Sequence, residues 1–336
     1  MKRVALLALA LAVVFAFGVG PLFGSTEPRR GDGAARRLYE RSQLAASEAA
    51  FSGVIAIQWR GRSGVHQATV HAVRVGGVLQ VDGKGGRLLA AGARRWERVG
   101  NRWTTSWDLA GAGRGNVEPD RWRFDVGRGS AVAGVPTTTI EARDAHTGLL
   151  RARYYVTRSD AFLLRREVLD RAGRVSYAVG FVEFSRLADQ RPHAPTNGEQ
   201  DRAPHRVSHI ETDFRAPDHV GAYQLVGRYE RADGTLQLLY TDGLFSVSVF
   251  QRIGDLDPAT LPPDPDRWEV ANDETARAYA SSAGPVAVWS TDDAVVVAVS
   301  DGPTDELHTF ASGFDRDERS VGEKIADFVL GPFGWN

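Results

Sequence analysis

The sequence predicts an α+β fold, mostly antiparallel β, in which a larger and a smaller β domain are joined by a linker. From residue 51 onward, apolar side chains recur with a period of two in many short runs, which is typical of half-buried strands. Short glycine-containing turns separate successive runs, so neighbouring strands should pair antiparallel, and a Rossmann or TIM-barrel fold is disfavoured. Residues 186–208 are polar, contain three prolines and have no apolar period, which indicates a linker.

We expect residues 1–24 to carry the chain into or across a membrane. Lys2 and Arg3 supply a positive start, and residues 4–24 contain no charged, hydroxyl or amide side chain. A cleaved signal has an apolar stretch of about 7 to 15 residues, whereas a membrane span needs roughly 20, so this length favours an uncleaved anchor. Cleavage stays open as the alternative. The bulk of the chain is expected outside the cytoplasm, in the periplasm or cell envelope.

Composition excludes several classes of protein. There is no cysteine, which excludes thiolate catalysis, disulfides, zinc ribbons and a lipid-attachment cysteine. The 41 basic and 42 acidic residues leave a net charge of −1, and the basic residues are spread along the chain, so nucleic acid is not an expected partner.

The larger domain is expected over residues 51–185, after a short, weakly amphipathic helix within residues 25–50. Several of its strands are apolar on both faces, which requires apolar cover on each side, as in a sheet curved round a helix or a lumen. The expected strands are 51–60, 67–75, 78–82, 94–99, 102–107, 121–126, 137–142, 151–157, 162–169 and 175–184.

The smaller β-rich domain is expected over residues 209–320, followed by a C-terminal tail at 321–336. Its strands are predicted at 223–231, 236–241, 245–252, 286–290 and 294–300. Helical segments are predicted at 304–314, with Thr304 as N-cap, and at 319–330.

Aromatic residues of the larger domain suggest an apolar cavity, although an ordinary core would use them equally well. The candidate lining residues are Ile55, Ile57, Trp59, Trp96, Trp103 and Trp107.

No recognised catalytic motif is present: the sequence has no Gly-x-Ser-x-Gly elbow, no His-Glu-x-x-His pair and no phosphate-binding loop. The histidines near the linker are irregularly spaced, and four prolines interrupt the acidic residues of 255–266, so neither set predicts a metal site. We therefore expect no catalytic residue, no cofactor and no metal, and a protein that is not an enzyme. A hydrolase that uses scattered carboxylates stays open as a third reading.

Two stretches resemble the RseB/MucB family of extracytoplasmic regulators of an envelope-stress sigma factor. Residues 238–250 (LLYTDGLFSVSVF) are similar to the family's Tyr-Ser-Asp-Gly-Leu turn and the Ser-Val-Phe strand after it, with Thr241 in place of serine. Residues 131–136 (AVAGVP) and 163–175 (LLRREVLDRAGRV) resemble a family strand and hairpin, without the usual proline. The likeness extends loosely from residue 51 to about residue 314 and weakens towards the C-terminus.

The resemblance implies a half-barrel larger domain, similar to lipoprotein carriers, and a smaller domain. It also implies a role: binding a membrane-spanning anti-sigma factor, modulating its proteolysis, and release by a lipid-like signal. The partner-binding residues it suggests are Tyr240, Asp242, Gly243, Leu244 and Phe245. The alternative on the same scaffold is a lipid or lipoprotein carrier of the cell envelope with an acyl ligand, since one fold hosts both tasks.

Overall fold

The computed structural model describes residues 33–83, 86–91, 94–99, 102–107, 121–187, 205–206, 214–231, 233–270, 275–291 and 294–314. The predicted export segment 1–24, nearly all of the predicted linker and the C-terminal tail lie outside these residues. Among the helices described, none is long and apolar enough to span a membrane.

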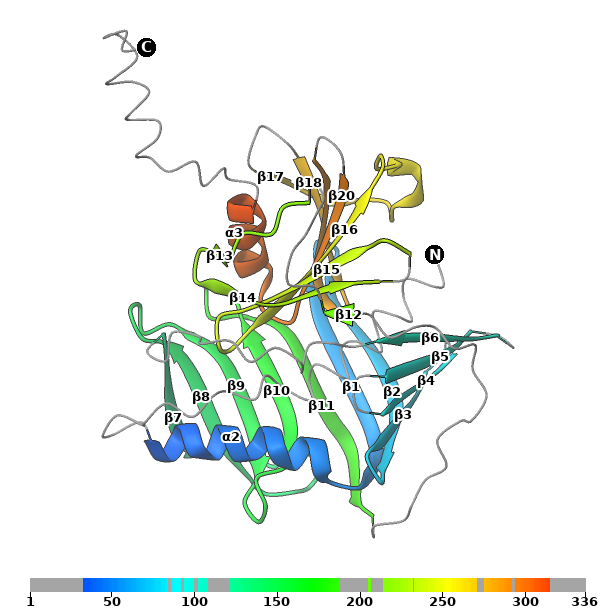
Figure 1. Cartoon of the computed structure of the whole chain (residues 1–336). Helices are drawn as coiled ribbons and strands as arrows, with labels where there is room; N and C mark the ends of the chain where they lie inside the picture. The colour runs from blue at the N-terminus through cyan, green and yellow to red at the C-terminus, as the bar shows by residue number, and fades with distance from the viewer. Residues whose placement is uncertain are drawn as a thin grey trace, which may run out of the picture.

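Helix α2 (Gly33–Glu48) precedes an antiparallel sheet of eleven described strands, in the order β6-β5-β4-β3-β2-β1-β11-β10-β9-β8-β7. Figure 1 shows this larger sheet curving, with α2 lying across its inner face. The strands are β1 (Phe51–Gly61), β2 (Gly64–Val75), β3 (Val78–Gly83), β4 (Gly86–Ala91), β5 (Arg94–Val99), β6 (Arg102–Trp107), β7 (Trp122–Arg128), β8 (Thr137–Asp144), β9 (Leu150–Thr157), β10 (Leu163–Leu169) and β11 (Val175–Arg186).

Aromatic packing explains why α2 lies on this face. Tyr39 of α2 stacks on Phe124 of β7 at 4.8 Å and meets Tyr154 of β9 edge-on at 5.0 Å between ring centroids. Phe51, Phe162 and Phe181 form a second aromatic group on the inner face. Burying large rings removes much apolar area from water, so these contacts anchor the helix to the curved sheet.

The second sheet is also antiparallel and lies against one end of the first, with helix α3 (Thr304–Phe314) packed on it (Figure 1). Its path is β12-β14-β15-β16-β20-β19-β18-β17, and β13 pairs with β14. The strands are β12 (His205–Arg206), β13 (His219–Val220), β14 (Tyr223–Glu230), β15 (Leu236–Thr241), β16 (Ser246–Ile253), β17 (Asp266–Glu269), β18 (Thr275–Ser281), β19 (Gly284–Ser290) and β20 (Ala294–Ser300), and a 3-10 turn, η1, covers Pro258–Thr260. We call this sheet and α3 the smaller unit.

The predicted fold class is confirmed: the described chain is α+β and mostly antiparallel, with a half-barrel-like larger sheet and a smaller β unit. Two differences are informative. β4, β17 and β18 were not predicted, because their small or charged residues give little apolar alternation. The end of the predicted linker, His205–Arg206, forms β12 and pairs with Tyr229 and Glu230.

Candidate functional site

The turn between β15 and β16 is built by one carboxylate and one glycine. Asp242 accepts hydrogen bonds from the backbone N–H groups of Leu244 at 2.9 Å and Phe245 at 2.8 Å. Gly243 has a φ of +93°, a conformation that side chains bearing a Cβ disfavour. The Asp-Gly pair therefore determines the local shape of this turn.

The same turn is the point at which the smaller unit meets the larger sheet. The guanidinium of Arg121 lies 3.1 Å from the Asp242 carboxylate, and the Trp122 indole donates a hydrogen bond of 3.0 Å to the Asp242 carbonyl. The Trp122 and Phe245 rings meet edge to face, with centroids 5.7 Å apart. These residues are far apart in the sequence, so the contact is a product of the tertiary fold.

Asp242 has no solvent exposure, and this burial changes the pKa of its carboxyl group. Burial raises the pKa of Asp242 to about 6, although Arg121 and the backbone N–H groups of Phe245 and Leu244 act in the opposite direction. The Glu306 carboxylate also raises it. The turn therefore holds a carboxylate that titrates closer to neutrality than an ordinary aspartate does.

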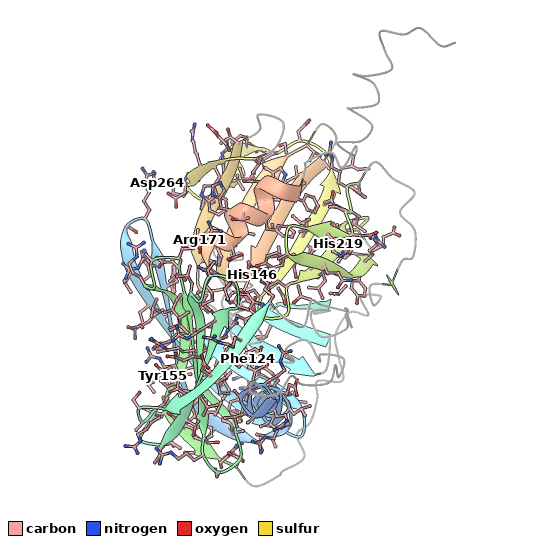
Figure 2. The ribbon with its side chains drawn as sticks, turned by 90° about the vertical axis from the view of Figure 1, so that its left-hand side faces the viewer. Phe124, His146, Tyr155, Arg171, His219 and Asp264 are labelled. Atoms are coloured by element: carbon pink, nitrogen blue, oxygen red, sulfur yellow. The ribbon has the colours of Figure 1, made fainter. Side chains whose placement is uncertain are left out.

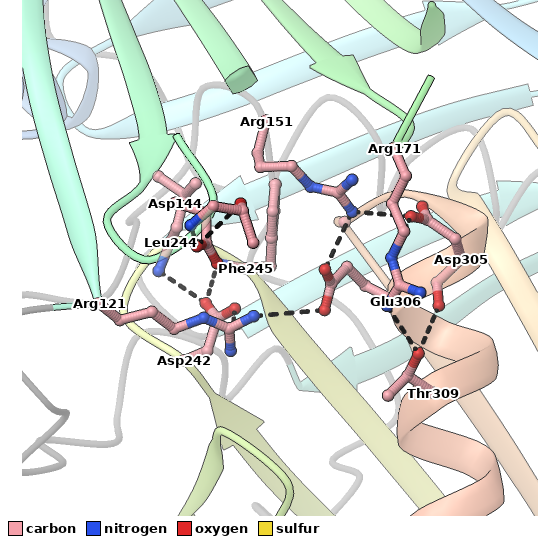
Figure 3. A network of polar contacts seen from close by, with 12 residues as sticks. Arg121, Asp144, Arg151, Arg171, Asp242, Leu244, Phe245, Asp305, Glu306 and Thr309 are labelled. Carbon is pink, nitrogen blue, oxygen red and sulfur yellow. Dashed lines mark hydrogen bonds and ion pairs between the residues drawn. The ribbon is translucent and has the colours of Figure 1, made fainter. Parts of the chain in front are cut away.

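A second group of contacts joins the larger sheet to the first turn of α3 (Figure 3). One Arg151 nitrogen lies 3.0 Å from Asp305 and 2.9 Å from Glu306, and Arg121 lies 3.4 Å from Glu306. Arg171, on the turn between β10 and β11, lies 3.2 Å from Asp305 and donates a hydrogen bond of 3.1 Å to the Thr309 hydroxyl. Figure 2 shows Arg171 at the border between the two sheets.

A third contact is deeper. Arg166 of β10 is only 4% exposed, and its guanidinium lies 3.0 Å from the Asp301 carboxylate and donates to the Asp301 carbonyl at 3.3 Å. The other Asp301 oxygen accepts from the Ser246 N–H at 2.7 Å. Burial opposes the charge on Arg166, but the Asp301 carboxylate outweighs burial and raises the pKa of Arg166 above its usual value.

The charges are segregated between the two sides of this contact region, which we call the junction. The larger sheet and its turns supply Arg121, Arg151, Arg166 and Arg171; the smaller unit supplies Asp242, Asp301, Asp305 and Glu306. Chemically, such an arrangement binds and orients charged groups. Among the residues that the structure describes, no cluster of three or more His, Asp or Glu side chains could hold a metal ion.

Of the five predicted partner-binding residues, Asp242 and Phe245 contact the larger sheet at the junction. Tyr240, Asp242, Leu244 and Phe245 are buried, and Gly243 is half-buried. The Tyr240 hydroxyl donates to the Pro217 carbonyl at 2.8 Å. Since four of the five are covered in this arrangement, direct contact with a partner would require the junction to open, and their role in binding stays a prediction.

The predicted cavity residues are placed less uniformly. Ile55 and Ile57 are fully buried in the core, and Trp59 is half-buried and stacks on His66 at 5.6 Å. The side chains of Trp96, Trp103 and Trp107 lie outside the described part of the structure. Their backbone register is known: Trp96 pairs with Leu89, Trp103 with Arg98 and Trp107 with Arg94.

Ile55 pairs with Val70, and the next position on the same face of β2 is Ala72. From Ala72 the paired positions on this face are Val81, Leu88 and Glu97. Trp96 therefore belongs to the neighbouring row. The six residues do not follow one face of the sheet by register, and an apolar cavity stays a prediction.

Sequence reasoning missed the arginines of the junction and all of its acids except Asp242. One signal was present: the alternation in residues 163–169 puts Arg166 on the same face as Leu164 and Val168, and a lone arginine on an apolar face needs a counter-charge. The identity of that counter-charge, Asp301, could not be read from spacing.

Comparison with solved structures finds related folds. The chain is similar in structure to MucB. A crystal structure of MucB is 19% identical, with a TM-score of 0.47, over 84% of this chain and 98% of that one. The MucA/MucB complex of Pseudomonas aeruginosa is 16% identical, with a TM-score of 0.42, over 83% and 98% of the two chains.

A LolA superfamily protein from Nitrosomonas europaea is 10% identical, with a TM-score of 0.20, over 79% and 90%. No protein-family model and no curated protein matches the chain. At these values no residue role is carried over from those proteins.

Proposed function

We propose that this chain is an extracytoplasmic regulator, related to the RseB/MucB family, that binds a membrane-spanning anti-sigma factor, modulates its proteolysis and lets go in response to a lipid-like signal. One observation carries this proposal. The segment whose sequence resembles that family, residues 238–250, includes the turn that contacts the larger sheet, through Asp242 and Phe245. The proposed role is non-catalytic.

Within this proposal, the turn acts by setting the relation between the two units. The Asp242 carboxylate accepts hydrogen bonds from the backbone of Leu244 and Phe245 and also pairs with Arg121, so a change at this residue alters both the turn and the contact. Ion pairs join the two sides of the junction, and a partner that supplies the same charges can replace them. A partner that binds one side then competes with the other side.

Recovery of the partner tests the proposal. The full-length chain, tagged at its C-terminus, is used as bait in detergent extracts of envelopes from its own source. We expect an anti-sigma factor among the proteins that it retains. The Arg153→Gln variant, altered on the outer face of the sheet and away from the junction, should retain the same partner. Consistent failure of the unaltered bait to recover any anti-sigma factor contradicts the proposal.

A second candidate is a lipid or lipoprotein carrier, favoured by the buried apolar inner face of β1 with Phe51, Ile55 and Ile57. Native mass spectrometry of the purified chain should then show a bound acyl chain. Changing Trp103 and Trp107 to glutamate should abolish it if these residues line the site, whereas Arg153→Gln should not. A protein that is always empty counts against this candidate.

The two candidates differ in what they require of residues 1–24. We propose that this segment holds the protein at the outer surface of the membrane, which raises its effective concentration near a membrane-bound partner. A carrier that shuttles cargo must instead be released. N-terminal sequencing of the mature protein distinguishes them: a start near Ser25 disfavours the tethered regulator.

A further inference from the structure

Three arginines from separate elements converge on two adjacent carboxylates. Arg121 precedes β7, Arg151 belongs to β9 and Arg171 lies on the turn after β10, yet all three contact Asp305 or Glu306 in the first turn of α3 (Figure 3). Guanidinium groups match carboxylates in geometry and charge better than any other side chain does. The rim of the larger sheet is therefore shaped to bind a pair of neighbouring acids.

The arginine side has donors that α3 does not use. Arg151 is 2% exposed, and its Nε and Nη1 atoms have no hydrogen-bond partner among the described residues. A buried donor without a partner costs free energy, so it marks a position where a further acceptor would be bound. Figure 3 shows both dashed contacts of Arg151, to Asp305 and to Glu306, leaving from a single nitrogen.

Helix α3 divides its contacts between the two units. Its apolar side belongs to the smaller unit: Phe310 packs edge to face on Tyr240 at 5.1 Å, and Phe314 packs on Trp289 at 6.0 Å. Its contacts with the three arginines are made by Asp305, Glu306 and the Thr309 hydroxyl. The arginines thus recognise a polar turn and not the hydrophobic face of the helix.

We propose that Arg121, Arg151 and Arg171 form a receptor for two adjacent carboxylates at the start of a helix, which α3 fills in this arrangement and which an acidic segment of another polypeptide fills when the two units separate. This proposal deepens the proposed function, on which it rests for the partner's identity, by stating the chemistry of the segment that the partner would supply. α3 then acts as an internal competitor for that segment.

A peptide taken from the chain itself tests the receptor. The probe is fluorescein-labelled residues 303–314 (PTDELHTFASGF), titrated with the full-length chain and followed by fluorescence anisotropy. Neutralising the internal competitor with Asp305→Asn and Glu306→Gln should tighten binding of this peptide about tenfold relative to the unaltered chain, because the arginines are then free of their internal acids. A peptide with the same two changes should bind about tenfold more weakly than the acidic peptide.

Arginine variants in the neutralised background identify the site. Arg151→Gln should remove about tenfold of the affinity, since it loses a buried, charge-assisted pair. Arg153→Gln, which alters the next-but-one residue of the same strand on the outer face, should leave the affinity unchanged. Equal binding of the acidic and neutral peptides, or equal effects of the two arginine changes, overturns the receptor.

Loss of folding in the neutralised variant is checked by circular dichroism and avoided by a second route. Asp305 and Arg171 have side chains that are 26% and 59% exposed, so Asp305→Asn and Arg171→Gln should both fold. In the Asp305→Asn background the internal Arg171–Asp305 pair is already removed, and Arg171→Gln should there weaken binding of the acidic peptide about threefold. An unchanged affinity overturns the proposal. Failure of the peptide to bind while an anti-sigma factor is still recovered from extracts rejects the receptor and leaves the proposed function standing.

Discussion

Both faces of strands β7 to β11 carry charged residues, but the charges on the two faces have their partners in different parts of the molecule. On the outer face, register places Asp125, Glu141, Arg153 and Glu167 directly opposite one another on successive strands. On the inner face, the neighbouring row runs through Ile140, Tyr154, Arg166, Val179 and Ile57. The outer row satisfies its charges within one sheet, whereas Arg166 finds its carboxylate, Asp301, only on the smaller unit.

The ion pairs on the outer face lie at the solvent-exposed surface of one sheet, whereas the ion pair on the inner face joins the two units. The Arg143–Asp125 pair is separated by 3.5 Å, with side chains 31% and 52% exposed, and solvent screens it. The Arg166–Asp301 pair is separated by 3.0 Å, with side chains 5% and 11% exposed. Removing one partner leaves a solvated charge in the first case and a buried, uncompensated charge in the second.

The largest expected effect comes from breaking the inner pair. Asp301→Ala should lower the free energy of unfolding by about 3 to 5 kcal/mol, because Arg166 stays buried without its counter-charge. Urea denaturation followed by tryptophan fluorescence measures it. The matched control on the outer row, Asp125→Ala, should cost about 1 kcal/mol or less. Equal losses would show that the two faces do not differ in this way.

Restoring neutrality should recover much of that loss. Arg166→Met added to Asp301→Ala replaces the buried cation with an apolar side chain that can pack against Tyr154 and Val179. We expect the double variant to be at least about 2 kcal/mol more stable than Asp301→Ala alone, because a buried ion pair is often replaceable by apolar residues at little cost. The same urea titration applies. A double variant that is less stable than the single one contradicts the assignment of Asp301 as the counter-charge.

A third expectation concerns pH. The pKa of Asp242 is raised to about 6 in the folded protein by burial, above its ordinary value of 3.8, so the folded state binds this proton more readily than the unfolded state does. Its contribution therefore favours folding at low pH and is lost as pH rises through about 6. The free energy of unfolding of the unaltered chain minus that of Asp242→Asn should fall by about 2 kcal/mol between roughly pH 4.5 and pH 7.5. Urea titrations of both proteins across this range measure the difference.

Asp170, on the hairpin between β10 and β11, supplies the opposite case. Burial opposes its ionisation, but hydrogen bonds from the Arg174 N–H and guanidinium outweigh burial and hold the pKa of Asp170 below its usual value. The free energy of unfolding of the unaltered chain minus that of Asp170→Asn should be positive above about pH 4. It should decline as the pH falls below that value. If the stability difference changed with pH in the same direction for both aspartates, burial at the junction would not be the cause of the pH dependence at Asp242.

The smallest expected effect is the removal of one hydrogen bond at the turn. Trp122→Phe deletes the N–H that donates to the Asp242 carbonyl and keeps a ring against Phe245. We expect a loss of about 1 kcal/mol, the usual value for a neutral hydrogen bond, measured as a shift in the urea midpoint. Trp268→Phe, where the ring lies beside His308, is the control with no such bond assigned.

The parts that sequence predicted well are those fixed by local pattern. Residues 236–241 and 294–300 were predicted as strands with the bounds that β15 and β20 have, because their alternation is strong and turn residues flank them. The helix at 304–314 was predicted with Thr304 as its N-cap, and α3 covers Thr304–Phe314, so Thr304 is already its first helical residue. β18 was missed, since its buried positions are alanines that contribute little to a hydrophobic pattern.

The junction could not be predicted in the same way. Arg121 meets Asp242, and Arg166 meets Asp301, across more than a hundred residues of chain. A single sequence states that such charges exist but not which ones meet, because the pairing depends on how two sheets pack. The resemblance of residues 238–250 to a known family located the turn but indicated a partner surface, whereas the structure uses most of that turn as internal contact.

The order of the larger sheet has a mechanical consequence. Its first and last strands, β1 and β11, are neighbours, with Phe51 opposite Arg186, and the Leu187 N–H donates to the Ala50 carbonyl. The chain thus reaches and leaves the sheet at one point, between two antiparallel strands. A force that pulls residue 50 away from residue 187 loads the hydrogen bonds between these strands one after another, as in a zipper, and not all at once in shear. Tension applied at these two residues would therefore open the half-barrel along its middle, starting beside the aromatic group of Phe51, Phe162 and Phe181.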